Sequence, residues 1–63
     1  MIKNTIKQLR LDKNITQEDL ADILNVSRQT IIAIEKGNYV PSLLLAMQIA
    51  KYFNKSVEEI FSL

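Results

Sequence analysis

The chain has 63 residues and contains neither cysteine nor histidine, which excludes disulfides, Cys/His zinc sites and Cys- or His-dependent catalysis. A chain of this length can bury only a modest fraction of its unfolded surface, so we expect one domain over residues 1–63, stabilised further by self-association. The net charge is only +1, no apolar run approaches the roughly 20 residues that span a bilayer, and the N-terminus lacks a signal-peptide core, so we expect a cytoplasmic protein with no membrane, metal or cofactor partner.

Five helices are expected along the chain, and no segment alternates at period two, so no sheet is expected. The first helix spans about residues 3–13 and the second follows residue 16. The third spans residues 28–36, the fourth runs from residue 42 to about 53, and a short fifth follows residue 56. The apolar residues at helical spacing that should form the core are Ile2, Ile6, Leu9, Leu20, Ala21, Leu24, Ile31, Ile34, Leu43, Ala46, Ile49, Ala50, Phe53, Val57, Ile60 and Phe61.

Capping residues mark the ends of these helices. An acid three positions after the cap completes a capping box at the second helix, with Asp19, and at the fifth, with Glu59. Gly37 suits the left-handed position that ends the third helix. The four residues that can accept hydrogen bonds from the orphan N–H groups of a following helix are Thr16, Ser27, Ser42 and Ser56.

Residues 16–37 therefore describe two short helices joined by a tight turn, and the second of them keeps one side free of core residues. At about 100° per residue, Ile31 and Ile34 lie on one side, flanked by Thr30 and Glu35. Small and polar side chains without an acid on the opposite side suit a helix in a DNA major groove, although a solvated helix face has the same pattern. The residues on that free side are Arg28, Gln29, Ile32, Ala33 and Lys36.

The chain here resembles a known family. The segments ITQEDLA, VSRQTI and IEKG, followed by PSL, IA and VEEIF, have the order and spacing of the Cro and phage-repressor (XRE-type) helix-turn-helix family, over nearly the whole chain. The resemblance is closest to the small single-domain bacterial regulators of that family. It implies a compact all-α domain of five helices that binds operator DNA as a homodimer.

Four residues of the third helix are the candidates for reading bases. Arg28 and Gln29 are the strongest, because arginine forms bidentate hydrogen bonds with guanine and glutamine with adenine, although Arg28 could instead touch only phosphate. Ile32 departs from the family, which more often has a small polar residue there. It could pack against a thymine methyl, join a protein contact or be a scattered surface residue. Ala33 would allow the backbone to approach the DNA closely.

The candidates for backbone contacts surround that face. Gln17 lies in the first turn of its helix, where its amide and the helix N–H groups could hold a phosphate, with simple solvent exposure as the alternative. The resemblance favours phosphate, because the family uses a glutamine here as a backbone clamp. Ser27 and Thr30 suit capping and backbone contact better than base reading. The remaining candidates are Lys36, Asn38 and Tyr39.

The resemblance also implies a salt bridge between Arg10 in the first helix and Glu35 in the third, which would orient the third helix. Two independent solvated charges are the alternative. We expect little net stability from such a bridge, because desolvation opposes the attraction.

Several apolar residues are not assigned to the expected core. A chain of this size would gain stability if another surface covered them. The expected cover is a second copy of the chain, through the fifth helix and the end of the fourth, although another protein could serve. The candidate interface residues are Leu44, Met47, Tyr52, Phe61 and Leu63.

The function expected from these features is a transcriptional regulator, acting as a repressor that occludes a promoter at a palindromic operator. Because the net charge is small, a dimer with two recognition helices is more workable than a monomer. The alternative is an antitoxin-like or regulatory protein-interaction module with the same fold. An enzyme is not expected, because the chain is too small for a sizeable pocket and its acids do not cluster in an apolar setting.

Overall fold

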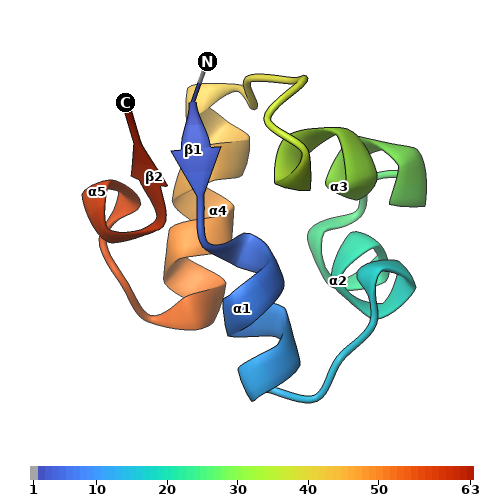
Figure 1. The fold of residues 1–63 in the computed structure, drawn as a ribbon. Coiled ribbons are helices and arrows are strands. Elements are labelled where there is room, and N and C mark those ends of the chain that lie inside the picture. Colours follow the sequence, from blue (N-terminus) through green and yellow to red (C-terminus); the bar gives the residue numbers. More distant parts are fainter. Residues whose placement is uncertain (1) are drawn as a thin grey trace.

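Five helices and two short strands make up the fold in the computed structural model, which describes residues 2–63 (Figure 1). The chain begins with a strand, continues through the helices, and ends with a strand that returns to the first. In chain order the elements are β1 (Lys3–Asn4), α1 (Ile6–Asp12), α2 (Gln17–Leu24), α3 (Arg28–Glu35), α4 (Leu43–Phe53), α5 (Val57–Ile60) and β2 (Phe61–Ser62).

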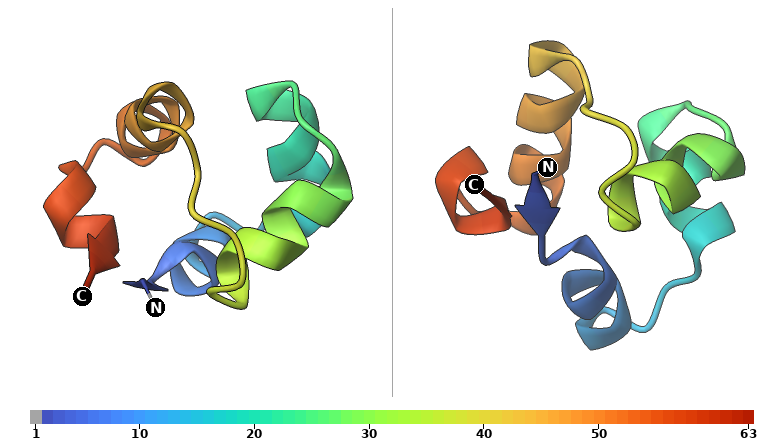
Figure 2. Two further views of the ribbon diagram at one scale, coloured as in Figure 1. Left: turned by 90° about the horizontal axis from the view of Figure 1, so that it is seen from above. Right: turned by 45° about the horizontal axis from the view of Figure 1, so that its top comes forward.

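The helices surround one apolar core. In both views of Figure 2, α2 and α3 lie on one side of α4, while α5 and β2 lie on its other side. The core draws residues from every helix, as the 3.6-residue periodicity of each predicts. Its largest fully buried side chains are Ile6, Leu20, Ile31, Ile34, Ile49 and Ile60.

The caps that begin the helices form as the sequence predicts. The Thr16 hydroxyl accepts a hydrogen bond from the Asp19 N–H at 3.0 Å, and the Asp19 carboxylate accepts one from the Thr16 N–H at 2.9 Å. Ser56 and Glu59 form the second capping box. There the Ser56 backbone N–H donates to the Glu59 carboxylate, which lowers the pKa of Glu59. The hydroxyls of Ser27 and Ser42 cap α3 and α4.

Residues in the left-handed conformation end the longer helices. Gly37 has φ 79° after α3, as predicted. The Gly37 N–H donates to the Ile34 carbonyl at 2.9 Å, and the Asn38 N–H donates to the Ala33 carbonyl at 3.0 Å, which is the Schellman pattern. Asparagine is among the few other residues that tolerate this conformation. It takes the equivalent place after α1, α2 and α4, at Asn14, Asn25 and Asn54.

The expectation of a purely helical chain is wrong at its two ends. β1 and β2 pair antiparallel, with Asn4 opposite Phe61. The first helix therefore begins at Ile6 instead of about residue 3, and Phe61 belongs to a strand. Strands of two residues are too short to show alternation, so the sequence carries no period-two signal for them. The fold is mostly helical, and all-α is an approximation.

The expected core face of α4 needs one correction. Leu43 is 73% exposed, whereas Leu45, which was not expected in the core, is only 8% exposed. At 100° per residue, the buried stripe is centred near Ile49 and Phe53, and Leu43 lies about 90° from that centre. The other expected core residues are buried or half-buried, and Ile2 is half-buried beside β1.

Candidate nucleic-acid interface

The α2–turn–α3 unit presents the N-terminal half of α3 to solvent. Thr30 donates its backbone N–H to the Ser27 hydroxyl at 3.1 Å, and the two side-chain oxygens are 2.9 Å apart. Both hydroxyls are thus engaged in the cap, while Ser27 itself stays exposed and Thr30 is half-buried. The cap fixes the first turn of α3, from which Arg28 and Gln29 project.

The outward face of α3 matches the division expected from its periodicity. Ile31 and Ile34 are each 1% exposed. Arg28 and Gln29 are exposed at the start of the helix, and Ile32 and Ala33 are half-buried further along. Ile32 therefore offers only part of its side chain to a ligand. At its start the face carries two long side chains, Arg28 and Gln29, which can form bidentate hydrogen bonds. Further along, the shorter apolar side chains of Ile32 and Ala33 project less from the helix.

The one acid of α3 is withdrawn from that face. Glu35 accepts two hydrogen bonds from Arg10 of α1, from Nε at 2.7 Å and from Nη2 at 3.1 Å. The Arg10 side chain is only 8% exposed and the Glu35 side chain only 7%. The hydrogen bond to Glu35 raises the pKa of Arg10. The ion pair implied by the resemblance is present, and it joins α1 to the end of α3.

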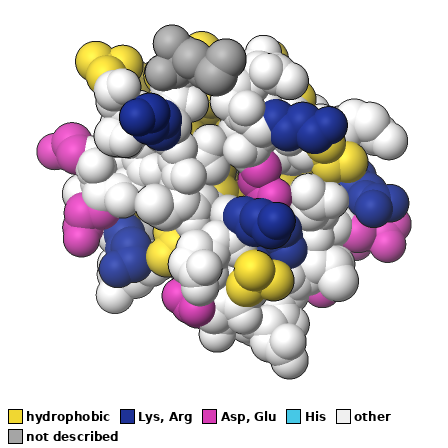
Figure 3. Space-filling model, in the orientation of Figure 1, with side chains coloured by type: hydrophobic (Ala, Val, Ile, Leu, Met, Phe, Trp, Pro, Cys, Tyr) yellow, Lys and Arg dark blue, Asp and Glu magenta, His cyan; other side chains and the backbone are white. Residues whose placement is uncertain are grey.

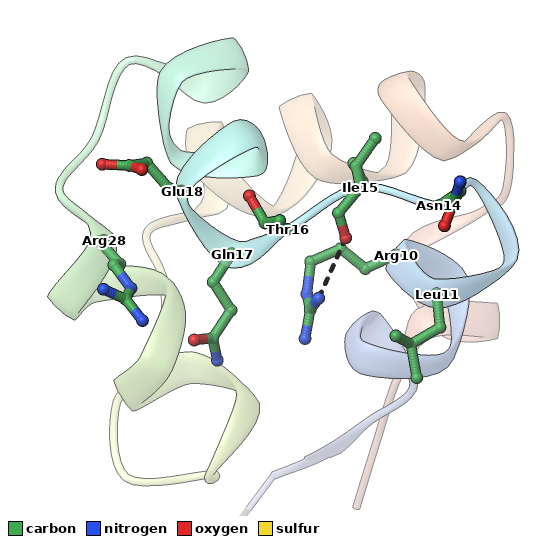
Figure 4. Close-up of a pocket in the computed structure, with 8 residues that line it drawn as sticks. All are labelled: Arg10, Leu11, Asn14, Ile15, Thr16, Gln17, Glu18 and Arg28. Carbon is green, nitrogen blue, oxygen red and sulfur yellow. Dashed lines mark hydrogen bonds between the residues drawn. The ribbon is translucent and has the colours of Figure 1, made fainter.

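Gln17 extends this ion pair into a network of three elements. Its Nε2 donates to Glu35 Oε1 at 3.1 Å. Arg10 Nη1 donates to the Ile15 carbonyl at 3.1 Å, which is the bond dashed in Figure 4. Within residues 2–63, no buried side-chain nitrogen or oxygen lacks a hydrogen-bond partner. The network therefore satisfies its buried charges and also holds the Gln17 side chain in place.

Gln17 and Arg28 border the same open depression, of about 510 Å³, at the start of α2 (Figure 4). The Glu18 side chain points away from the Gln17 amide in this view. The Gln17 amide keeps its oxygen and one N–H free of Glu35, because only one donation to that carboxylate is made. The depression thus combines the Arg28 cation, the Gln17 amide and the first turn of α2, with the Glu18 carboxylate also in its lining.

The remaining candidates lie around the end of α3. Lys36 is the exposed residue that closes the helix, and Asn38 and Tyr39 are exposed in the loop after it. Tyr39 and Thr30 line a second open depression, of about 420 Å³, together with Leu44. Basic and acidic side chains alternate over the visible face, so there is no continuous basic patch in this view (Figure 3).

The five expected interface residues lie on α4, in β2 and at Leu63. Leu44 and Tyr52 line depressions on the α2 side of α4, and the Tyr52 ring packs edge-on against Phe53 at 5.0 Å. Met47 and Leu43 are four residues apart in α4, so they lie on the same side of that helix, and both are largely exposed. We use the name α4–β2 patch for four apolar residues of α4 and the C-terminal strand region that are exposed or half-buried: Leu43, Met47, Phe61 and Leu63.

Among residues 2–63, no group of carboxylates is placed to hold a metal ion. Over the same residues, every helix is too short or too polar to cross a membrane.

Comparisons with known proteins agree with this geometry. A family model described as helix-turn-helix matches residues 6–60. The HTH-type transcriptional regulator MJ0272 of Methanocaldococcus jannaschii is 62% identical over 60 residues, which are 95% of this chain and 91% of that protein. The phage CTXphi transcriptional repressor RstR of Vibrio cholerae is 31% identical over 98% of this chain and 56% of its own length.

The fold also matches a crystal structure of a proposed DNA-binding protein from Bacteroides fragilis, with a TM-score of 0.83 and 26% sequence identity. The match covers 98% of this chain and 100% of that one. The family match extends from α1 to α5 and includes the α2–turn–α3 unit. The chain therefore belongs to the helix-turn-helix family of the Cro and phage-repressor (XRE) type.

Proposed function

We propose that this protein binds specific DNA sequences and regulates transcription by placing the N-terminal half of α3 in the major groove. The observation that carries the proposal is the pairing of Glu35 with Arg10, because it leaves the outward face of α3 with no free carboxylate. Such a carboxylate would repel the phosphates on either side of the groove. No catalytic role is assigned to any residue.

The exposed residues of α3 and their neighbours divide into two roles. Arg28 and Gln29 read base edges, while the shorter Ala33 and half-exposed Ile32 allow close approach and contact with thymine methyl groups. Phosphates are held around this face and fix the register of the helix in the groove. The backbone contacts are assigned to Gln17, Ser27, Thr30, Lys36, Asn38 and Tyr39.

Repression is the proposed outcome of binding, since a protein seated on a promoter excludes other proteins from it. The similarity to RstR, a transcriptional repressor, supports this direction of regulation. Residues 1–63 would act as one DNA-binding unit, in the cytoplasm where bacterial and archaeal DNA is found.

We propose that a second copy of the chain covers the α4–β2 patch. Leu63 is 98% exposed, and Leu43 and Met47 are also largely exposed, so these large apolar side chains face solvent in the single chain. A monomer with a net charge of +1 gains little from phosphate neutralisation. A dimer that presents two α3 helices to one DNA duplex would bind it more tightly, because both helices contribute to the binding free energy.

Leu63→Glu tests this interface. The wild type should sediment as a dimer at micromolar concentration, and the variant should shift toward monomer because a charge in an apolar interface is costly to desolvate. Leu11→Glu is the matched control, since Leu11 is an exposed leucine of α1 that does not belong to the proposed patch, and its variant should remain dimeric. A wild type that stays monomeric, or an equal effect at Leu11, would contradict the proposed interface.

Selection of bound duplexes from a random pool tests the function itself. The selected sequences should contain inverted half-sites whose centres are about 10 base pairs apart, because a two-fold dimer presents both recognition helices to one side of the duplex. Direct repeats would contradict the two-fold arrangement. A pool that yields no preferred sequence would contradict DNA reading and favour a protein-interaction module.

A further inference from the structure

We propose that Asn4 is a positioning residue that sets the orientation of α3 on DNA by tying the end of α3 to the strand pair β1–β2. The inference rests on the proposed function of α3 as the helix that reads DNA. It concerns a residue outside the helix-turn-helix, whose side chain bonds to the main chain of α3 across 30 positions of sequence.

The Asn4 amide makes two hydrogen bonds with opposite requirements. Its Nδ2 donates to the Ile34 carbonyl at 2.8 Å, and its Oδ1 accepts from the Ile6 N–H at 3.2 Å. If the amide were reversed, its NH₂ group would face the Ile6 N–H and its oxygen would face the Ile34 carbonyl, and neither hydrogen bond could form. The two partners therefore fix the orientation of the amide. Asn4 therefore caps the start of α1 with one atom and holds the end of α3 with the other.

The carbonyl of Ile34 is a suitable anchor because it already takes part in the end of the helix. It accepts the Gly37 N–H at 2.9 Å in the turn that closes α3. A carbonyl oxygen has two lone pairs, so it can accept Asn4 Nδ2 as well without giving up that turn. The Asn4 bond thus acts on the geometry of the helix end itself.

Asn4 is held firmly enough to act as a support. Its backbone lies in β1, opposite Phe61 of β2, and the neighbouring Thr5 N–H donates to the Ile60 carbonyl at 3.0 Å. Both views in Figure 2 place β1 between β2 and the C-terminal end of α3. The two ends of the chain therefore meet at a point from which a side chain reaches the recognition helix.

Two supports meet at successive residues of α3. Asn4 holds the main chain of Ile34, and Arg10 with Gln17 holds the side chain of Glu35. Ser27 fixes the opposite end of the helix through its cap. Because the Ser27 cap holds one end of α3 and the contacts of Arg10 and Gln17 with Glu35 remain at the other, loss of the Asn4 bond should let α3 tilt without unfolding it.

The pair Asn4→Asp and Asn4→Ser tests this role. Aspartate keeps the acceptor for Ile6 but turns an oxygen toward the Ile34 carbonyl. Serine keeps a hydroxyl that can accept from Ile6, adds no charge, and is too short to reach Ile34. Both should bind the selected operator about tenfold more weakly, which corresponds to the loss of one hydrogen bond, with less than about a twofold change for unrelated DNA at the same salt.

Amide hydrogen exchange in the free protein supplies a second readout that does not involve DNA. The Gly37 and Asn38 amides, which close α3, should exchange faster in both variants, while the core amides of α4 exchange at the wild-type rate. Wild-type exchange together with wild-type operator preference would overturn the inference. Loss of preference in Asn4→Asp alone would also overturn it, because the effect would then be one of charge.

These outcomes separate the inference from the proposed function. If the wild type prefers no DNA sequence, the proposed function fails, whereas the exchange of Gly37 and Asn38 still reports whether Asn4 holds the end of α3. If the wild type selects an operator and both variants bind it with unchanged preference, the function stands and the positioning role of Asn4 fails.

Discussion

Replacing Glu35 by alanine should destabilise the protein by about 3–5 kcal/mol, because the change leaves a buried arginine without its counter-ion. The Arg10 side chain is only 8% exposed and donates two hydrogen bonds to Glu35. Small domains have only a few kcal/mol of total stability, so the variant should be largely unfolded at room temperature. Urea unfolding followed by circular dichroism measures the loss.

The double variant Arg10→Met with Glu35→Leu is the control for that result. It removes both charges together and places apolar side chains of similar length in the same position, so it should lose far less stability than Glu35→Ala. It should also bind DNA less selectively, because the link between α1 and the end of α3 is weaker. If Glu35→Ala unfolds at the same urea concentration as the wild type, the ion pair does not hold this fold together.

Gln29→Ala should weaken operator binding by roughly 1–3 kcal/mol, or about ten- to hundredfold, because it removes a bidentate contact with one base. Its affinity for unrelated DNA should stay nearly unchanged. The Gln29 side chain is exposed and makes no hydrogen bond to another of the described residues 2–63, so the substitution should not alter folding. Binding of both duplexes is measured at one salt concentration, since phosphate contacts make affinity strongly dependent on salt.

Gln17→Ala is the matched control at a residue of the same type. If Gln17 holds a phosphate, its loss should weaken operator and unrelated DNA by similar factors, because the backbone carries no direct sequence code. Gln17 also donates to Glu35, so the thermal unfolding of this variant must be compared with the wild type. If Gln17→Ala weakens binding to the operator but not to unrelated DNA, Gln17 reads sequence and does not hold a phosphate, which contradicts the role proposed for it.

The parts of the fold that could be predicted from sequence are those set within one turn of helix. The caps at Thr16 and Ser56 depend on residues three positions away, and the buried stripe of α3 depends on spacings of three. The pairing of β1 with β2 could not be predicted, because it joins the two ends of the chain through two residues on each side. The exposure of Leu43, by contrast, follows from its own helix, because Leu43 lies about 90° from the centre of the buried stripe of α4.

The candidate site divides in the same way. The polar character of the α3 face follows from its own periodicity, and the Arg10–Glu35 pair from the family resemblance. The donation from Gln17 to Glu35 and from Asn4 to Ile34 could not be predicted, since each depends on how separate elements pack. Asn4 carries one local signal that could have been used, because an asparagine two positions before Ile6 can cap a helix.

The measurement that tests the central claim most directly is a parallel selection of DNA by the wild type and by Gln29→Ala from the same random pool. If the outward face of α3 reads bases, the variant should lose its preference at one position in each half-site and keep the remaining consensus and spacing. An unchanged consensus from a folded Gln29→Ala protein would contradict the claim that this face of α3 reads DNA.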